Sequence, residues 1–309
     1  MQTIVSSDIE KASLVLKNGG VLVFPTETVY GIGADSRNLS ACERIYSIKN
    51  RPKDNPFIVH VDSIESMGKI AVIPSHFKDA IERLTPGPIT FIFEKKDESI
   101  FSTGLSTIGV RIPSHPIARK LLEISKTPVS APSANLSGRP SITRFKDAVS
   151  TLINKVDMIL EGEDSEIGVE STVVDLTLSR PVLLRPGGIS FTHLNQFFPN
   201  LQKYQESKEK NAKPASPGMK YRHYAPDAEV VLISPEEKIE MESAAFIGFK
   251  EQSVKFQRIV KTNLEYMHHL YSFFIDCDQR GFSRIYCSFP LTDEFEDVLL
   301  NRIYKSAMK

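Results

Sequence analysis

The sequence predicts an α/β protein with two domains joined by a linker. Strand-like and helix-like segments alternate over residues 1–198 and again over residues 228–309, which is the pattern of α/β domains. Residues 199–227 contain a polar, charged run without apolar periodicity, as linkers do. The length of 309 residues also favours about two domains.

The first domain opens with an apolar run at 21–24 after two glycines, which predicts a buried strand. A capping box at 40–43 predicts a helix that ends near Lys49, because Pro52 follows shortly. Pro116 stands where a first helical residue would, and apolar residues follow it at helical spacing. The other expected strands are 57–61, 89–93, 109–112, 158–160, 171–176 and 181–184, and the other expected helices are 75–84 and 190–198.

The second domain repeats this alternation on a smaller scale. Apolar runs predict strands at 230–233, 244–249 and 284–288, and amphipathic patterns predict helices at 264–279 and 293–307. We therefore expect a small, Rossmann-like parallel α/β domain. The linker before it ends in SPGMKYRHYAP, which is too aromatic for a plain spacer.

Composition and charge limit the class of protein. Lysine and arginine total 38 and aspartate and glutamate total 38, so the formal net charge is zero. This argues against a protein that binds polyanions nonspecifically. The three cysteines lack C-x-x-C spacing, which argues against a zinc ribbon and is typical of a reducing compartment. The start lacks a signal-peptide pattern and no run reaches roughly 18 apolar residues, so we expect a cytoplasmic protein without a membrane segment.

Three cations follow one another at the end of an expected helix, namely Lys49, Arg51 and Lys53. Cations at a helix C-terminus also interact with the helix dipole, so a solvated cap is one interpretation. The other interpretation is a triphosphate clamp. There lysine provides a point charge, arginine a bidentate fork, and Asn55 further amide donors.

Other polar residues stand where core packing would not require them. His60 ends an expected strand, where a lone histidine is more often structural. Arg111 lies inside an apolar strand, and a buried arginine needs a carboxylate from the protein or from a substrate. Gly31 and Gly33 resemble half of a dinucleotide-binding fingerprint, although a tight loop is the favoured interpretation. The small residues and hydroxyls of 130–141 would suit phosphate.

An ordered series of motifs runs through the chain: FPTETVYGIG, KNRPKDNPFIVHV, LTPGPIT, GVRIP, APSANLSG, GVESTVVD and LRPGGI. In this order they resemble the YrdC-like threonylcarbamoyl-AMP synthase family. SPGMKYRHYAP and the α/β tail resemble its long, two-domain form. The resemblance covers nearly the whole chain and implies a YrdC-like twisted α/β sheet with a large concave cavity.

The resemblance implies a nucleotidyltransferase that makes threonylcarbamoyl-adenylate from L-threonine, bicarbonate and ATP and releases pyrophosphate. Mg²⁺ is expected with the ATP, and the sequence shows no carboxylate cage for a metal of its own. The product would pass to a downstream tRNA threonylcarbamoyl transferase. Lysine and arginine outnumber aspartate and glutamate in the linker, and weak contact with tRNA is compatible with this basic linker. Because the carbamate and ATP are both anionic, the reaction needs cations at the site.

The family's site residues match positions of this chain. The threonine-binding positions match Thr28, His60, Arg111, Ala131 and Ser171, and Arg111 would hold the amino-acid carboxylate. The nucleotide and phosphate positions match Lys49, Arg51, Asn55, Thr107, Ser133, Asn135, Ser141 and Arg185. Lys49 and Arg51 are the expected catalytic residues, with Lys49 as the main electrostatic catalyst.

Alternatives remain for the linker and for the function. Residues 199–227 would form a lid with Tyr221 or Tyr224 against the nucleotide, or a hinge with packed tyrosines. The runner-up function is an RNA-binding or ribosome-assembly module that uses the same cavity, supported by the K-x-R cluster and the basic linker. Against it stand the neutral charge and the lack of a basic stripe interleaved with aromatics. A third candidate function is carbamoyl transfer in hydrogenase maturation, but proteins of that assembly carry Cys-rich zinc motifs, which this sequence lacks.

Overall fold

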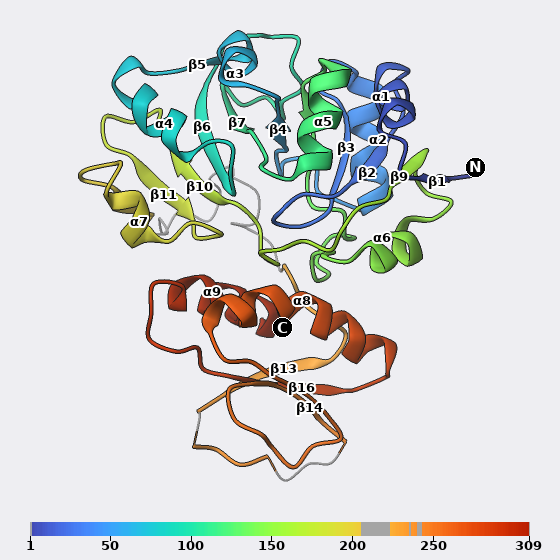
Figure 1. Cartoon of the computed structure of the whole chain (residues 1–309), viewed down its shortest axis with the longest axis vertical. Helices are drawn as coiled ribbons and strands as arrows, with labels where there is room; N and C mark the ends of the chain where they lie inside the picture. The colour runs from blue at the N-terminus through green and yellow to red at the C-terminus, as the bar shows by residue number, and fades with distance from the viewer. Residues whose placement is uncertain (1, 205–222, 235, 240–242, 309) are drawn as a thin grey trace.

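The computed structural model describes residues 2–204, 223–234, 236–239 and 243–308. These residues form two α/β domains, as the sequence predicts (Figure 1). The larger domain contains a 12-stranded sheet and the smaller a 4-stranded sheet.

The sheet of the larger domain mixes parallel and antiparallel pairs. Its strands lie in the order β1 (Ile4–Ser6), β9 (Met158–Leu160), β2 (Leu22–Phe24), β3 (Gly31–Asp35), β8 (Val129–Ser130), β4 (Ile58–His60), β7 (Thr107–Arg111), β6 (Ile89–Lys95), β10 (Thr172–Asp175), β11 (Val182–Arg185) and β12 (Gln202–Lys203), with β5 (Ala71–Val72) beside β6. β4 and β7 run parallel, with His60 opposite Arg111. The register therefore makes neighbours of two site residues from separate motifs.

The helices of the larger domain are α1 (Ile9–Lys17), α2 (Leu39–Lys49), α3 (Ile64–Ile70), α4 (Lys78–Leu84), α5 (Pro116–Ser125), α6 (Phe145–Leu152) and α7 (Phe191–Asn195). The N-cap of α2 is Asn38, whose side chain accepts a hydrogen bond from the amide of Ala41, so the start predicted from the 40–43 capping box was wrong by two residues, about half a turn. The end of α2 at Lys49 and the position of Pro116 in the first turn of α5 are confirmed. The predicted helix at 75–84 divides into a 3₁₀ turn and α4.

The segment of Gly31 and Gly33 is a strand rather than a tight loop or a dinucleotide-binding turn. β3 pairs antiparallel with β2 and with β8. A Cβ atom at Gly33 would lie 2.6 Å from Cγ1 of Val129. This glycine is therefore required by close packing against the neighbouring strand.

The smaller domain is a parallel sheet with helices, as predicted. Its strands lie in the order β13 (Glu229–Ile233), β16 (Arg284–Ser288), β14 (Ala245–Gly248) and β15 (Phe256–Ile259), and all three pairs are parallel. The sequence did not predict β15. The helices α8 (Asn263–Gln279) and α9 (Glu296–Ala307) cover the face of the sheet that is turned toward the larger domain (Figure 1).

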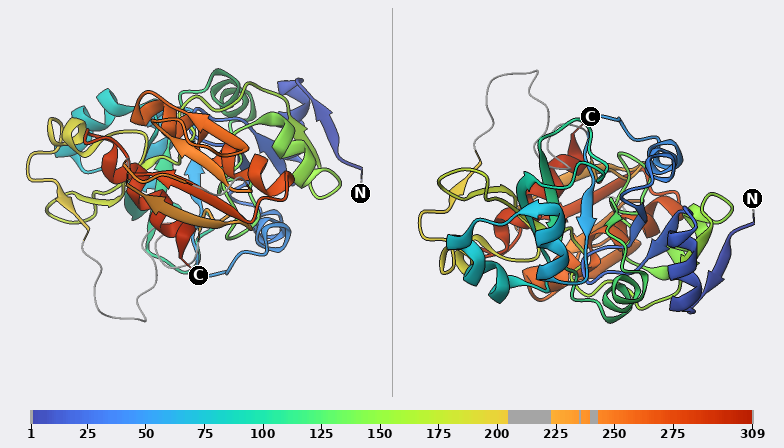
Figure 2. Two further views of the ribbon diagram at one scale, coloured as in Figure 1. Left: turned by 90° about the horizontal axis from the view of Figure 1, so that it is seen from below. Right: turned by 90° about the horizontal axis from the view of Figure 1, so that it is seen from above.

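The two domains are joined by packed contacts as well as by the linker. Val169 of the larger domain belongs to the hydrophobic core of the smaller one. Arg144 forms an ion pair of 2.6 Å with Asp276 of α8, and Ser190 donates to Glu294 at 2.5 Å. Seen along the axis through both domains, the smaller domain lies across the middle of the larger one (Figure 2).

Candidate active site

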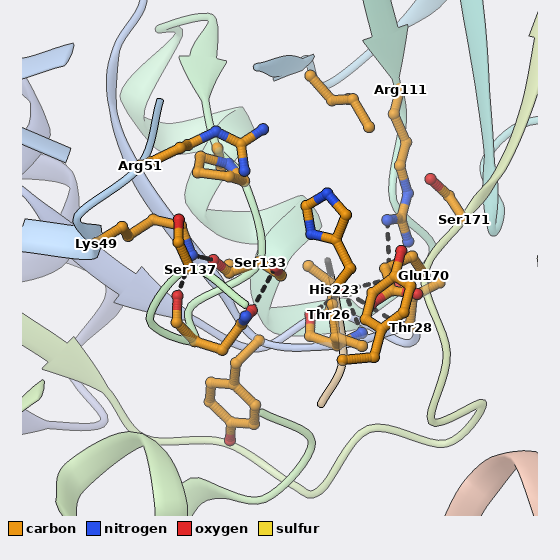
Figure 3. A pocket seen from close by; sticks show the side chains of 18 of the residues that line it. Thr26, Thr28, Lys49, Arg51, Arg111, Ser133, Ser137, Glu170, Ser171 and His223 are labelled. Carbon is orange, nitrogen blue, oxygen red and sulfur yellow. Dashed lines mark hydrogen bonds between the residues drawn. The ribbon is translucent and has the colours of Figure 1, made fainter. Parts of the chain in front are cut away.

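A cavity that is open to solvent lies where the predicted motifs meet. It is lined by eleven of the residues expected at the site: Thr28, Lys49, Arg51, His60, Arg111, Ala131, Ser133, Asn135, Ser171, Arg185 and Tyr224. They come from strand ends, from the end of α2 and from the loops that follow β2 and β8. Lys49 and Arg51 lie on one side of the cavity, and Arg111 and Ser171 on the other (Figure 3).

Arg111 is buried, and protein groups accept hydrogen bonds from all three nitrogens of its guanidinium, which has five N–H donors in all. Nη2 forms an ion pair of 2.7 Å with Glu27, Nη1 donates to the Thr28 hydroxyl at 2.8 Å, and Nε donates to the Gly87 carbonyl at 3.3 Å. Burial would raise the pKa of Glu27, but Arg111 outweighs it and the net shift is downward, so the carboxylate stays ionised. The required partner is thus a protein carboxylate.

His60 lies beside Arg111 as a neutral imidazole. Burial, reinforced by the charge of Arg111, lowers the pKa of His60 to about 3. Its ring meets Phe24 edge-on, with 6.0 Å between the ring centroids. Nδ1 has no hydrogen-bond partner among the described residues. A buried acceptor or donor of this kind is suited to a polar group of a ligand.

Lys49 ends α2 and is 1 % exposed. Its Nζ donates to the carbonyls of Ser133, at 2.5 Å, and of Asn135. Burial, followed by the charge of Arg51, lowers the pKa of Lys49 well below its ordinary value. Among the described residues Nζ donates to these two carbonyl oxygens and pairs with no carboxylate, so an anion in the cavity would meet no competing counter-ion from that part of the chain.

Arg51 is held by the loop that follows α2. Nε and Nη2 donate to the carbonyls of Asn55 and Pro56 at 3.2 and 3.0 Å, and the guanidinium lies 5.6 Å from the centre of the Phe57 ring. Burial lowers the pKa of Arg51 to about 10, which leaves it protonated at neutral pH. Arg51 and Lys49 thus line the same side of the cavity, which is the arrangement that the triphosphate-clamp interpretation predicts.

The loop after β8 forms the polar wall beside Lys49. The Ser133 hydroxyl donates to the Asn135 side chain at 2.5 Å, and Nδ2 of Asn135 donates to the carbonyls of Leu136 and Arg139. Arg185, at the end of β11, donates to the Ser171 carbonyl at 2.8 Å. These contacts fix the orientation of hydroxyl and guanidinium groups before any ligand binds.

Comparison with known proteins gives the family. A family model described as "Telomere recombination" matches residues 14–187, and one described as "Threonylcarbamoyl-AMP synthase, C-terminal domain" matches residues 189–308. The chain belongs to the threonylcarbamoyl-AMP synthase family. This confirms the resemblance carried by the ordered motifs, including the long, two-domain form.

Relatives in this family support the assignment over most of the chain. The threonylcarbamoyl-AMP synthases of Pyrococcus abyssi and Bacillus subtilis are each 40% identical, over 80% and 74% of this chain and 74% and 68% of their own lengths. The crystal structure of P. abyssi Sua5 complexed with L-threonine matches with a TM-score of 0.91 and 33% identity, covering 99% of this chain and 97% of that one. E. coli YciO matches 60% of this chain and 95% of its own, with a TM-score of 0.53 and 28% identity.

Some residues that the family resemblance assigned to the nucleotide do not line the cavity. Asn55 supports Arg51 through its carbonyl. Ser141 is buried and donates to Glu170 at 2.5 Å, so it lies one contact behind the wall. Thr107 begins β7 and lines a separate depression beside Phe57. Tyr221 lies outside the described residues.

The structure also adds residues that sequence reasoning did not select. Glu27, which lies within the FPTETVYGIG motif, is the partner of Arg111. Glu170 and His223 line the cavity, together with Thr26 and Ser137 (Figure 3). Tyr30 also lines it. Arg302 of α9 pairs with Glu170 at 3.0 Å. Glu27 and Glu170 were detectable as acids within motifs of small and hydroxyl residues, whereas Arg302 carries no such signal.

The described residues contain neither a metal-binding cluster nor a membrane-spanning helix. No group of three or more His, Cys, Asp or Glu residues is placed there to hold a metal ion. Among the helices of the same residues, none has the length and apolar character needed to cross a membrane.

Proposed function

We propose that this protein makes threonylcarbamoyl-AMP from L-threonine, bicarbonate and ATP and releases pyrophosphate. The observation that carries the proposal is the similarity, over 99% of the chain, to a Sua5 structure complexed with L-threonine. The shape and charge of the cavity support it, because cations lie on both of its sides.

Threonine would bind on the side of Arg111. The guanidinium would receive the amino-acid carboxylate, sharing its donors with Glu27 and Thr28. The neutral imidazole of His60 adds no positive charge that would repel the amine. Ala131 and Ser171 also line the cavity, and we expect them to limit the size of the side chain that fits beside Arg111.

ATP would bind on the side of Lys49 and Arg51, with Ser133 and Asn135 beside the phosphates, and Arg185, which also lines the cavity, would contact the nucleotide from the wall beside Ser171. The neutral amine of threonine attacks bicarbonate, and water leaves as the carbamate forms. A carbamate oxygen then attacks the α-phosphorus of ATP, and the bond between the α-phosphorus and the departing pyrophosphate breaks. Lys49 and Arg51 would offset the repulsion between these anions, so catalysis rests on positioning and charge.

Mg²⁺ is proposed as a companion of the triphosphate and not as a resident of the protein. Glu170, the carboxylate that lines the cavity, is already paired with Arg302. A carboxylate engaged in this way is a poor additional ligand for a hard cation. The metal would therefore be held by phosphate oxygens.

The remaining proposals concern the surroundings of the site. His223 and Tyr224 line the cavity, which supports a lid role for the end of the linker, although residues 205–222 lie outside the described part. The product would pass to a downstream tRNA threonylcarbamoyl transferase, with weak tRNA contact by this chain, in the cytoplasm. An RNA-binding module as the main function is not favoured, because the matched relatives are named as synthases.

The proposal is tested by isotope exchange between ATP and pyrophosphate, with mass spectrometry of the adenylate. We expect exchange only when L-threonine and bicarbonate are both present. Serine in place of threonine is the matched substrate control, because it lacks only the methyl group. Exchange without an amino acid, or tight tRNA binding without any adenylate, would overturn the proposal.

A further inference from the structure

A buried ion pair joins the smaller domain to the wall of the cavity. Arg302 of α9 is 0 % exposed, and its Nε donates to Glu170 at 3.0 Å. Nη2 donates to the Pro186 carbonyl at 2.9 Å, and the guanidinium lies 5.3 Å from the centre of the Tyr224 ring. Tyr271 of α8 donates to the same Glu170 oxygen at 3.2 Å. Two helices of the smaller domain therefore reach one residue of the larger domain.

Docking alone does not explain why this contact is charged. Arg144 with Asp276, and Ser190 with Glu294, already hold the domains together away from the cavity. A buried ion pair usually adds little stability over well-packed apolar residues of the same volume. A specific role for the charge is therefore the better explanation of the Arg302 contact.

Glu170 lies between two parts of the wall where ATP is proposed to bind. Its Oε1 accepts the Ser141 hydroxyl, which in turn lies 3.5 Å from the Asn135 side chain. The next residue, Ser171, accepts Arg185 through its carbonyl. A displaced Glu170 would therefore disturb both Asn135 and Arg185.

The sign of the charge matters as much as the position. Glu170 is negative and lines a cavity for which we propose a triphosphate, so an uncompensated carboxylate there would repel the substrate. Resting on that proposed function, we propose that Arg302 is a positioning residue of the nucleotide site: the smaller domain supplies the charge that neutralises Glu170 and holds it between Ser141 and Arg185. The smaller domain thereby becomes part of the active site.

The surroundings of Glu170 predict how the site responds to the loss of Arg302. Burial would raise the pKa of Glu170, but Arg302 and Arg185 outweigh it and lower the pKa. The charged or titratable groups that face Glu170 are Arg302, Tyr271, Arg185, Tyr224 and His223. Without Arg302 the pKa rises, and acidification then neutralises the carboxyl and removes the repulsion.

The test compares Arg302→Met, Glu170→Gln and the double variant with the wild type. Equilibrium dialysis with ATP measures nucleotide binding independently of turnover, and steady-state assays give KM for ATP and for threonine. We expect Arg302→Met to weaken ATP binding by about tenfold or more, with a smaller change in KM for threonine. The double variant should recover most of the loss, because it no longer buries an unpaired carboxylate.

The matched control is Arg144→Met, which removes an interdomain ion pair that lies away from the cavity. It should lower the thermal midpoint and leave ATP affinity unchanged. The ratio of variant to wild-type affinity for Arg302→Met should move toward one as the pH falls from about 8 to about 6. If Arg302→Met fails to fold, Arg302→Lys, which keeps the charge, should bind ATP nearly as the wild type does.

Three results would overturn the inference. They are unchanged ATP affinity in Arg302→Met, a double variant no better than the single one, and equal losses for Arg144→Met and Arg302→Met. Failure of the proposed function gives a different result from failure of this inference. In that case the wild type would bind ATP without forming the threonine adenylate, and the ATP affinities of the variants could still be compared by dialysis.

Discussion

Replacing Lys49 by methionine would separate the catalytic value of the buried ammonium from its cost to the fold. Methionine has a similar length, so it fills the same space without the charge. In the wild type, burial and the charge of Arg51 lower the pKa of Lys49. Between this lowered pKa and the ordinary value the unfolded state binds more protons, so the free energy of unfolding rises with pH in that range. The variant loses this slope.

The substitution should lower kcat but should not lower the stability of the fold. Removing one pre-positioned donor to a developing anion typically costs about 100- to 1,000-fold in kcat, or about 2.7–4 kcal/mol. We expect this loss for Lys49, because its Nζ contacts only the carbonyls of Ser133 and Asn135 within the described structure. Replacing a buried charge by an apolar group of similar volume is neutral or stabilising. The thermal midpoint should therefore stay constant or rise.

The assay is adenylate formation under saturating substrates, paired with a thermal melt at neutral pH. Lys53→Met is the matched control, because Lys53 follows in the same segment, is 80% exposed and lies 3.9 Å from Glu43. It should keep near-normal kcat. Near-normal activity of Lys49→Met, or a loss of activity that is matched by a lower thermal midpoint, would refute the reasoning.

Two further predictions concern stability. Gly168→Ala should destabilise the protein by about 2–4 kcal/mol, because Gly168 has φ +83° and a Cβ would lie 2.5 Å from Cα of His268. Gly104→Ala is the control for backbone strain alone, because Gly104 has φ +77° and a Cβ there would meet nothing within 4 Å. Equal losses of stability for the two variants in denaturant melts would contradict the clash at Gly168. For His60, a folded-state pKa of about 3 means that the unfolded state takes up the proton first. The free energy of unfolding should therefore fall as the pH drops from about 6.5 toward about 3, by up to about 1.4 kcal/mol per pH unit. His60→Asn should flatten this dependence on pH, whereas the exposed-site control His76→Asn should leave it unchanged. An unchanged slope in His60→Asn would contradict the assignment of a neutral, buried His60.

Local signals predicted the elements that are long, apolar or sharply punctuated. The short strand at Leu22–Phe24 and the start of α5 at Pro116 follow from residues within a few positions of each boundary. β3 was missed because its glycines suggest a turn, whereas contact with Phe24 and Val129 makes them necessary in a strand. Such packing between strands is invisible to local periodicity.

The site was predictable to the extent that its residues lie in motifs. Lys49, Arg51 and Arg111 stand out because cations at those positions need a physical reason. Which carboxylate pairs with Arg111 could not be predicted, because Glu27 lies 84 residues away along the chain. The register of β4 and β7, and the turn after β2, decide that pairing.

The zero net charge illustrates why composition alone cannot describe this site. Among the described residues Lys49 and Arg51 donate to carbonyl oxygens and pair with no carboxylate, whereas Glu27 and Glu170 are each paired with an arginine. The cavity is therefore cationic within a chain that is neutral. One of the neutralising arginines comes from the other domain, 132 residues beyond its partner. If the inference about Arg302 holds, the smaller domain is part of the electrostatic design of the cavity, and removing it should change the charge of the site as well as the stability of the protein.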